Sequence, residues 1–287
     1  MDLEISGRTN TLTRCKPLLG TYVEISVSGD VTDETLIEQS NSAFAAIQLV
    51  QREMSFHDAF SELSIINQNA LNDWIELSPS MFKVLSKIDQ LNNDTYGSFD
   101  PSIAPVLLNL GSLPRHKSCD HDAPTAGVGV WRNVELGDHR ARFHSPAMLD
   151  LGGIAKGFAV DQALACIDSS LVCTVNAGGD IGMSHWQEQS IDILFGSKDS
   201  RATKEMEMRN SCLASSASYR NDGRSVIVDP KSAQPQKSNN TYSVFAPDCM
   251  TADALTKAAW LGTATPEIIN KHNASILVLD QHGQSLH

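Results

Sequence analysis

Hydrophobic positions divide the N-terminal part of the chain into a strand and a long helix. In "GTYVEISVSG", Val23, Ile25 and Val27 alternate with polar residues, which is typical of a strand with one buried face. Between Glu34 and Met54 apolar residues recur at helical spacing, so we expect a long amphipathic helix that follows a cap at Asp33.

Proline and glycine residues mark the boundaries of the elements expected in the middle of the chain. Ser78 with Pro79 opens a second helix, which ends before Gly97. Residues 109–144 are rich in Gly, Pro, His and Asp, which indicates loops with short strands around "GVGVW" and "VELG". From Leu149 we expect a strand, a glycine turn and a helix, followed by the strand "CTVNAGGDIG".

The C-terminal part reads mainly as strands with two helices. The expected strands are "SIDILFG", "CLASSAS", "SVIVDP", "TYSVFAP" and "ASILVLD", and "PKSAQPQKSNN" is expected to be a polar turn. One helix should run from about Met250 to Leu261, and another should begin at Thr265-Pro266. Helices and strands do not alternate steadily, so the sequence predicts an α+β fold with mixed sheets, organised as one domain over residues 1–287.

Charge argues against two classes of partner. The chain has 287 residues, 22 Lys and Arg against 34 Asp and Glu, and a formal charge of −12, which repels nucleic acid and anionic membrane surfaces. A phosphorylated small molecule is still compatible, because a helix N-terminus, a lysine or a divalent cation can attract it locally.

The spacing of the cysteines and the lengths of the apolar runs bear on the cellular location of the protein. The six cysteines are scattered without metal-site spacing, so we expect reduced or buried thiols. No apolar run is long enough for a signal peptide or a membrane span, so we expect a cytoplasmic protein without membrane insertion, or a periplasmic one if an export segment has been removed.

A glycine turn in "LDLGGIAKGFAVDQA" is the first candidate site. Gly152 and Gly153 lack Cβ atoms, so their backbone can approach a phosphate or offer a carbonyl to a metal. Lys156, in the first turn of the helix, opposes the helix dipole and is therefore either a solvated charge or an anion contact. A turn that serves only packing is the alternative.

Three further stretches carry candidate chemistry. "VNAGGDIG" supplies a second glycine turn, and two such turns suggest one shared cleft, with two unrelated turns as the alternative. Asp253, Thr256 and Lys257 share a helix face, where carboxylate and hydroxyl suit Mg²⁺ and an ordinary surface ion pair is the alternative. Phe99 beside Asp100 is either a platform for a planar ring or part of the core.

Eight stretches then resemble, in order, the ApbE-like FAD:protein FMN transferases. They are "CKPLLGTYVEIS", "MSFHDAFSELSIIN", "GSFDPSIAPVL", "LDLGGIAKGFAVD", "VNAGGDI", "SASYRN", "VDPKSAQP" and "SVFAPDCMTADALTKAAWLG", spanning about Cys15 to Gly262. The resemblance implies an ApbE-like fold with a nucleotide cleft. It also implies Mg²⁺-dependent transfer of the FMN half of FAD to a threonine hydroxyl of an acceptor flavoprotein, with release of AMP.

The resemblance also assigns residues. The metal would be held by Gly153, Asp253 and Thr256. Asp253 is one catalytic candidate, and Lys257, on the same helix face, is the other because of its charge rather than because of the resemblance. Asp180 is expected to fix its glycine turn rather than touch FAD. The expected FAD contacts are Leu19, His57, Ser98, Phe99, Asp100, Asp150, Lys156 and Ile227.

Two residues depart from the family pattern. Val226 stands where relatives place a histidine thought to act as base, and Lys257 stands where many carry a threonine metal ligand. Lys257 either supplies a positive charge to the pyrophosphate or has displaced the metal. The alternatives to a transferase are therefore a non-catalytic FAD-binding protein, an FAD pyrophosphatase that yields FMN and AMP, or a phosphate-site enzyme outside flavin chemistry.

Overall fold

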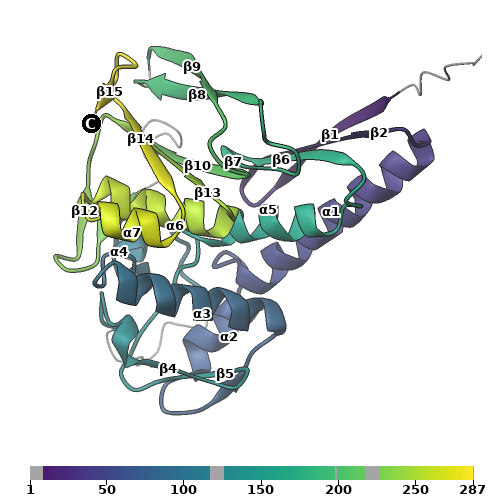
Figure 1. Ribbon diagram of the computed structural model, residues 1–287. Helices are drawn as coiled ribbons and strands as arrows, with labels where there is room; N and C mark the ends of the chain where they lie inside the picture. Colours follow the sequence, from purple (N-terminus) through teal and green to yellow (C-terminus); the bar gives the residue numbers. More distant parts are fainter. Residues whose placement is uncertain (1–8, 117–125, 198, 218–225, 287) are drawn as a thin grey trace, which may run out of the picture.

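A large antiparallel sheet forms the upper layer of the molecule (Figure 1). The computed structural model describes residues 9–116, 126–197, 199–217 and 226–286. In this part of the chain the sheet has eight strands in the order β1-β2-β6-β7-β10-β13-β14-β15. These strands are β1 (Asn10–Leu18), β2 (Thr21–Gly29), β6 (Val172–Ala177), β7 (Asp180–Met183), β10 (Cys212–Ala217), β13 (Thr241–Ala246), β14 (Ser275–Leu279) and β15 (Ser285–Leu286).

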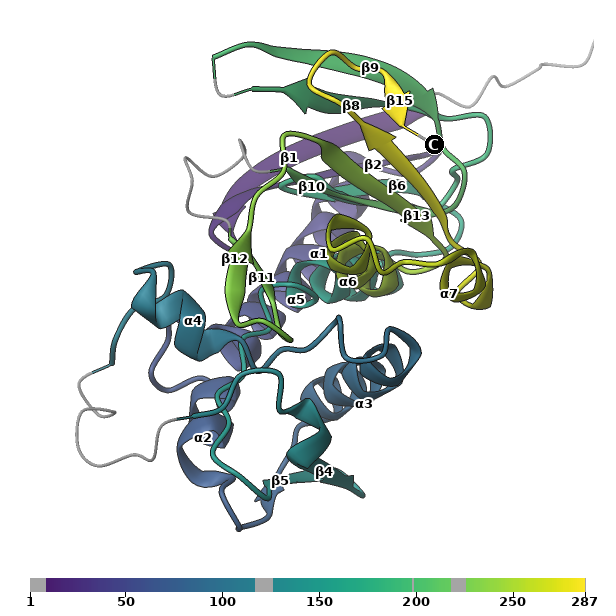
Figure 2. The same ribbon diagram turned by 90° about the vertical axis from the view of Figure 1, so that its left-hand side faces the viewer.

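Helices α1, α5 and α6 lie beneath this sheet, and α2 and α3 lie farther from it on the same side (Figures 1 and 2). Most of the helices begin at a Ser, Thr or Asp whose side chain accepts a backbone N–H from the first turn. The helices are α1 (Asp33–Met54), α2 (Glu62–Asn69), α3 (Pro79–Asp94), α4 (Ala104–Asn109), α5 (Ala155–Ala165), α6 (Cys249–Trp260) and α7 (Pro266–Lys271).

The two faces of the large sheet belong to two apolar cores. Because side chains alternate along a strand, Val244 of β13 points into the main core with the helices, whereas its neighbour Phe245 packs in a second cluster. Residues from the β8–β9 hairpin, including Ile193, complete this second cluster, so the hairpin covers the face opposite the helices. The hairpin consists of β8 (Ser190–Gly196) and β9 (Arg201–Glu207).

Two small sheets complete the fold. The first has the order β3-β5-β4, and the second pairs β11 with β12. Their strands are β3 (Ile75–Glu76), β4 (Val134–Gly137), β5 (Arg140–Phe143), β11 (Ile227–Asp229) and β12 (Gln234–Gln236).

The α+β class predicted from the sequence is confirmed. All four sheets described here pair antiparallel, and the parallel pairs are two isolated bridges. The five predicted helices are present as α1, α3, α5, α6 and α7, although Thr32 rather than Asp33 caps α1.

Four local predictions are corrected. The segment 149–151 is irregular rather than a strand, and "GVGVW" forms an isolated bridge at Gly127 and the start of a 3₁₀ turn. The predicted polar turn "PKSAQPQKSNN" contains β12. "CTVNAGGDIG" forms two strands joined by a tight turn at Gly178 and Gly179, because positive φ at both glycines reverses the chain.

None of the helices in the described ranges is long and apolar enough to cross a bilayer.

Candidate active site

A cleft of about 1330 Å³ is lined by the β1–β2 turn, strands of the large sheet, the β8–β9 hairpin, β11 and the segments that lead into α4 and α5. Drug-sized pockets measure roughly 300–1,000 Å³, so this cleft has room for a dinucleotide. Ten of the twelve site residues expected from the sequence line it, and these are Leu19, His57, Ser98, Phe99, Asp100, Asp150, Gly153, Lys156, Ile227 and Lys257. The other two, Asp253 and Thr256, are buried beneath Lys156 and Lys257.

One wall of the cleft contains the turn between β1 and β2. Leu19 (φ 56°) and Gly20 (φ 70°) form a two-residue loop in the left-handed region, which matches the twist of a hairpin. This conformation strains leucine, and the backbone N–H of Leu19 donates to Gln51 Oε1 of α1 at 2.7 Å. The turn is therefore fixed to α1 beside the cleft.

Asp100 organises a second wall. Its Oδ1 accepts from the backbone N–H and the hydroxyl of Ser102 at 2.8 and 2.6 Å, and its Oδ2 accepts from the Trp131 N–H at 3.2 Å. These bonds within the protein fix the segment that carries the buried Phe99 ring beside the cleft. Asp100 thus has a scaffolding role, and its direct contact with FAD stays a prediction.

The glycine turn before α5 lies at the cleft floor. A Cβ on Gly153 would stand 3.3 Å from Lys257 Cε and 3.6 Å from Phe99 Cε2, so the backbone here lies between a lysine stem and an aromatic ring. Asp150 Oδ2 accepts the Gly152 N–H at 3.2 Å, and burial raises the pKa of Asp150.

A close contact between α5 and α6 brings Asp253 to this turn. A Cβ on Gly157 would lie 2.2 Å from the Cys249 carbonyl oxygen, so only glycine permits the two backbones to approach this closely. As a result the Gly157 N–H, in the first turn of α5, donates to Asp253 Oδ2 at 3.3 Å. The positive end of α5 therefore helps to stabilise the Asp253 carboxylate.

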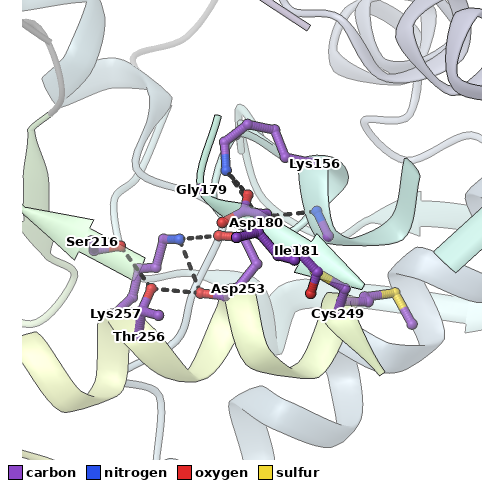
Figure 3. Close-up of polar contacts among 12 residues, drawn as sticks. Lys156, Gly179, Asp180, Ile181, Ser216, Cys249, Asp253, Thr256 and Lys257 are labelled. Atoms are coloured by element: carbon purple, nitrogen blue, oxygen red, sulfur yellow. Dashed lines mark hydrogen bonds and ion pairs between the residues drawn. The ribbon is translucent and has the colours of Figure 1, made fainter. Parts of the chain in front are cut away.

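Two lysines and two aspartates form the charged centre of the site (Figure 3). Lys257 Nζ binds Asp253 Oδ1 and also donates to the Asp253 carbonyl at 2.9 Å. Lys156 Nζ binds Asp180 Oδ2 and lies 3.3 Å from Asp253 Oδ2. Figure 3 shows that Lys257 reaches Asp253 along its own helix, while Lys156 comes from another element. We call these four residues the charge cluster.

Opposite charges within the cluster stabilise one another, whereas its two carboxylates repel each other. Burial alone would raise the pKa of Asp253, but Lys156 and Lys257 hold it at about 2. Burial likewise opposes the charge on Lys156, yet Asp180 and Asp253 raise its pKa above the ordinary value. For Asp180, burial and the nearby Asp253 carboxylate raise the pKa more than the two lysines lower it, so that it lies at about 6. Lys156 and Asp253 are therefore charged at neutral pH.

The groups expected to bind Mg²⁺ are already bonded within the protein, and in this arrangement they do not fit the ion. Both carboxylate oxygens of Asp253 already accept from lysine ammonium groups, and Oδ2 accepts from Gly157 as well. The Thr256 hydroxyl is fully buried, donates to the Asp253 carbonyl at 2.7 Å and bonds with Ser216 Oγ at 2.8 Å. In the described ranges no group of three or more His, Cys, Asp or Glu side chains is placed to hold a metal.

The role expected for Asp180 is corrected. The Gly178-Gly179 turn is fixed by Asn176, whose Oδ1 accepts the Gly179 N–H at 2.9 Å, whereas the Asp180 carboxylate binds Lys156. Sequence reasoning missed Asn176 and Ser216, which line the cleft. The position of Asn176 before a double-glycine turn could have indicated the first, but the Ser216–Thr256 bond depends on tertiary packing.

The remaining predicted contacts lie around the mouth of the cleft. His57 is exposed just after α1, and Ile227 lies on β11. Val226, which replaces the expected histidine, also lines the cleft and is half-buried. Its side chain cannot accept a proton, so the position supplies only apolar surface.

Comparison with known proteins agrees with this geometry. The sequence model of the ApbE family matches residues 19–278. The chain belongs to the ApbE family. This confirms the resemblance drawn from the eight stretches of sequence.

Individual ApbE relatives are similar along most of their length. The FAD:protein FMN transferase of Haemophilus influenzae is 26% identical over 317 residues, which cover 96% of this chain and 86% of that protein. The FAD:protein FMN transferase of Chlamydia muridarum is 31% identical over 251 residues, covering 78% and 76%.

Two solved structures share the fold. The ApbE protein of Thermotoga maritima superposes with a TM-score of 0.80 at 22% identity, and covers 97% of both chains. The flavin transferase ApbE of Vibrio cholerae gives 0.77 at 22% identity, covering 97% of this chain and 96% of that one. The predicted ApbE-like fold is thereby confirmed.

Proposed function

We propose that this chain transfers the FMN half of FAD to a hydroxyl group of an acceptor flavoprotein and releases AMP. Its ApbE relatives are named FAD:protein FMN transferases. The observation that carries the proposal is the meeting of Gly153, Lys156 and Lys257 at one part of a cleft large enough for a dinucleotide. In line with the resemblance, we propose threonine as the acceptor residue.

The chemistry is a displacement at phosphorus. A bond forms between the acceptor oxygen and the phosphorus of the FMN half, while the bond from that phosphorus to the bridging oxygen breaks. AMP leaves with the bridging oxygen, and the acceptor proton passes to water because Val226 cannot take it. Such a reaction needs positive charge and positioning more than covalent help from the protein, and Lys156 and Lys257 supply positive charge at the cleft.

The resemblance also implies Mg²⁺, which would neutralise pyrophosphate charge when bound. Because the donors around Asp253 are already used by lysines, we route no step through the ion.

The test follows both products. The chain is incubated with FAD and a threonine-bearing acceptor domain, the acceptor is examined by mass spectrometry, and AMP is quantified by chromatography. We expect AMP release matched by an FMN adduct on the acceptor.

The other outcomes would replace the proposal. AMP with free FMN and no adduct indicates an FAD pyrophosphatase, whereas retained FAD without AMP indicates a non-catalytic flavin-binding protein. Failure to retain FAD would point to phosphate chemistry outside the flavins. Val226 favours the first two of these alternatives, because it removes the expected base from the acceptor side of the cleft.

A further inference from the structure

Both oxygens of the Asp253 carboxylate are engaged by donors of the protein. Its Oδ1 binds Lys257 Nζ, and its Oδ2 accepts from Gly157 N–H and lies 3.3 Å from Lys156 Nζ. Only 1% of Asp253 is exposed, so a cation could reach it only after a lysine had moved. Lys257 follows Asp253 by four residues on α6, so the two side chains lie on the same face of the helix and their ion pair forms within that helix.

The charge cluster is also neutral as a whole. Asp180 and Asp253 contribute two negative charges, and Lys156 and Lys257 contribute two positive charges. A magnesium site draws its affinity from carboxylate charge that is not compensated by protein cations, together with substrate phosphates. Here the compensation is built into the protein, so little charge remains to attract Mg²⁺.

The two ammonium groups still have donors to offer. An ammonium carries three N–H donors. Lys257 uses two on Asp253, and Lys156 uses one on Asp180 and one on Asp253. Both side chains line the cleft, and they are 31% and 17% exposed for Lys156 and Lys257 respectively. One donor from each lysine is therefore left for an anion in the cleft.

We propose that Lys257 takes the place of a divalent cation in this protein, so that Lys156 and Lys257 bind the pyrophosphate of the dinucleotide directly and no cation binds at Asp253. The identity of the dinucleotide as FAD rests on the proposed function, but the exclusion of the cation does not. The two carboxylates position the lysines, and the lysines supply the positive charge for the leaving AMP.

The first test measures cation binding without any reaction. Mn²⁺ is titrated into the metal-free 287-residue chain, and free Mn²⁺ is measured by electron paramagnetic resonance. We expect no stoichiometric site in the wild type and one site per chain in Lys257→Thr, which restores a hydroxyl ligand and frees Asp253. The double variant Lys257→Thr/Asp253→Asn should lose that site again.

Lys271→Thr is the matched control. Lys271, the last residue of α7, forms an ion pair with Asp94 of α3, and neither residue lines the cleft. This variant should bind no Mn²⁺.

A stoichiometric Mn²⁺ site in the wild type that disappears in Asp253→Asn would overturn the proposal. This comparison requires only the wild type and one conservative variant. Absence of a site in folded Lys257→Thr would also contradict it.

The second test measures nucleotide binding. FAD is titrated by its fluorescence into wild-type protein with EDTA or with Mg²⁺, and we expect dissociation constants that agree within about twofold. Lys257→Met should weaken FAD binding by about tenfold, the usual effect of losing one charge-assisted hydrogen bond. A wild type that needs Mg²⁺ to bind FAD would refute direct binding by the lysines. If FAD does not bind under either condition, the proposed function fails, while the Mn²⁺ titration still decides whether Lys257 excludes a cation.

Discussion

Asp253 illustrates how single charges hold this site together. Lys156 and Lys257 keep the pKa of Asp253 at about 2, below the value of about 3.9 for an unfolded aspartate. A carboxyl whose pKa is depressed by folding adds stability above its unfolded pKa, and this contribution is lost as the pH falls through the folded pKa. The ion pairs of Asp253 should therefore stabilise the protein fully above pH 4 and disappear towards pH 2.

We predict that Asp253→Asn lowers the free energy of unfolding near pH 6, and that the gap to the wild type narrows between pH 4 and pH 2. Urea unfolding monitored by tryptophan fluorescence at several pH values measures both. A gap that stays constant across this window would show that Asp253 is not held ionised by the two lysines.

Under the proposed function, Val226 lies on the acceptor side of the cleft. It lines the cleft, and a general base at a reacting hydroxyl is typically worth about 10²- to 10⁴-fold in rate. We predict that Val226→His raises the rate of FMN transfer at least about tenfold, with unchanged FAD affinity, in single-turnover assays followed by mass spectrometry. Val226→Asn, which is polar but not basic, is the control. Equal rates for the two variants would exclude a base at this position.

At the scale of elements, the contact between α5 and α6 positions the charge cluster. Gly157 allows the Cys249 carbonyl to lie where a Cβ would otherwise stand, and this closeness brings Asp253 under the first turn of α5. Overpacking at a backbone contact typically costs about 1–3 kcal/mol.

We predict that Gly157→Ala lowers the free energy of unfolding by about 1–3 kcal/mol and weakens FAD binding as well. Gly153→Ala is the matched substitution, because its new methyl group would meet only the end of the Lys257 side chain and a ring edge of Phe99. Urea unfolding compares the two variants, and Gly153→Ala should keep near wild-type stability. Equal stability losses in the two variants would contradict the importance of the α5–α6 contact.

The β1–β2 turn offers a second test at this scale. Gly20 has φ of 70° and open space around its Cα, so a substitution there introduces backbone strain without a steric clash. We predict that Gly20→Ala destabilises the protein by about 1–2 kcal/mol, and that Gly20→Asn, which tolerates this conformation, destabilises it less. Chemical denaturation compares the two. If the two variants lose the same stability, the turn does not hold the left-handed geometry described here.

At the scale of the whole molecule, the helices and strands are easier to predict from the sequence than the irregular segments that join them. Alternation in "TYVEISVSG" and the caps before α3 and α7 are local signals, and these elements are present. The sequence predicts a strand over residues 149–151 because two buried leucines flank a polar residue there. In the structure the Leu149 N–H donates to Asn67 Oδ1 rather than to a neighbouring strand.

The candidate site was predictable as a set of residues but not as a set of contacts. The glycine turns and the Asp253–Lys257 spacing are visible in the sequence, and they meet at one cleft. The pairing of Lys156 with Asp180, 24 residues away, and with Asp253, 97 residues away, depends on how α5, α6 and β7 pack. The acceptor protein and the cytoplasmic location stay predictions.

The most direct test of the account is a crystal structure of the chain with FAD, grown in the presence of EDTA. We predict that the pyrophosphate lies in the cleft with one oxygen within about 2.7–3.2 Å of each of Lys156 Nζ and Lys257 Nζ, while both lysines keep their contacts with Asp253. Pyrophosphate bound away from these lysines, or a cation retained at Asp253 with Lys257 turned aside, would contradict it.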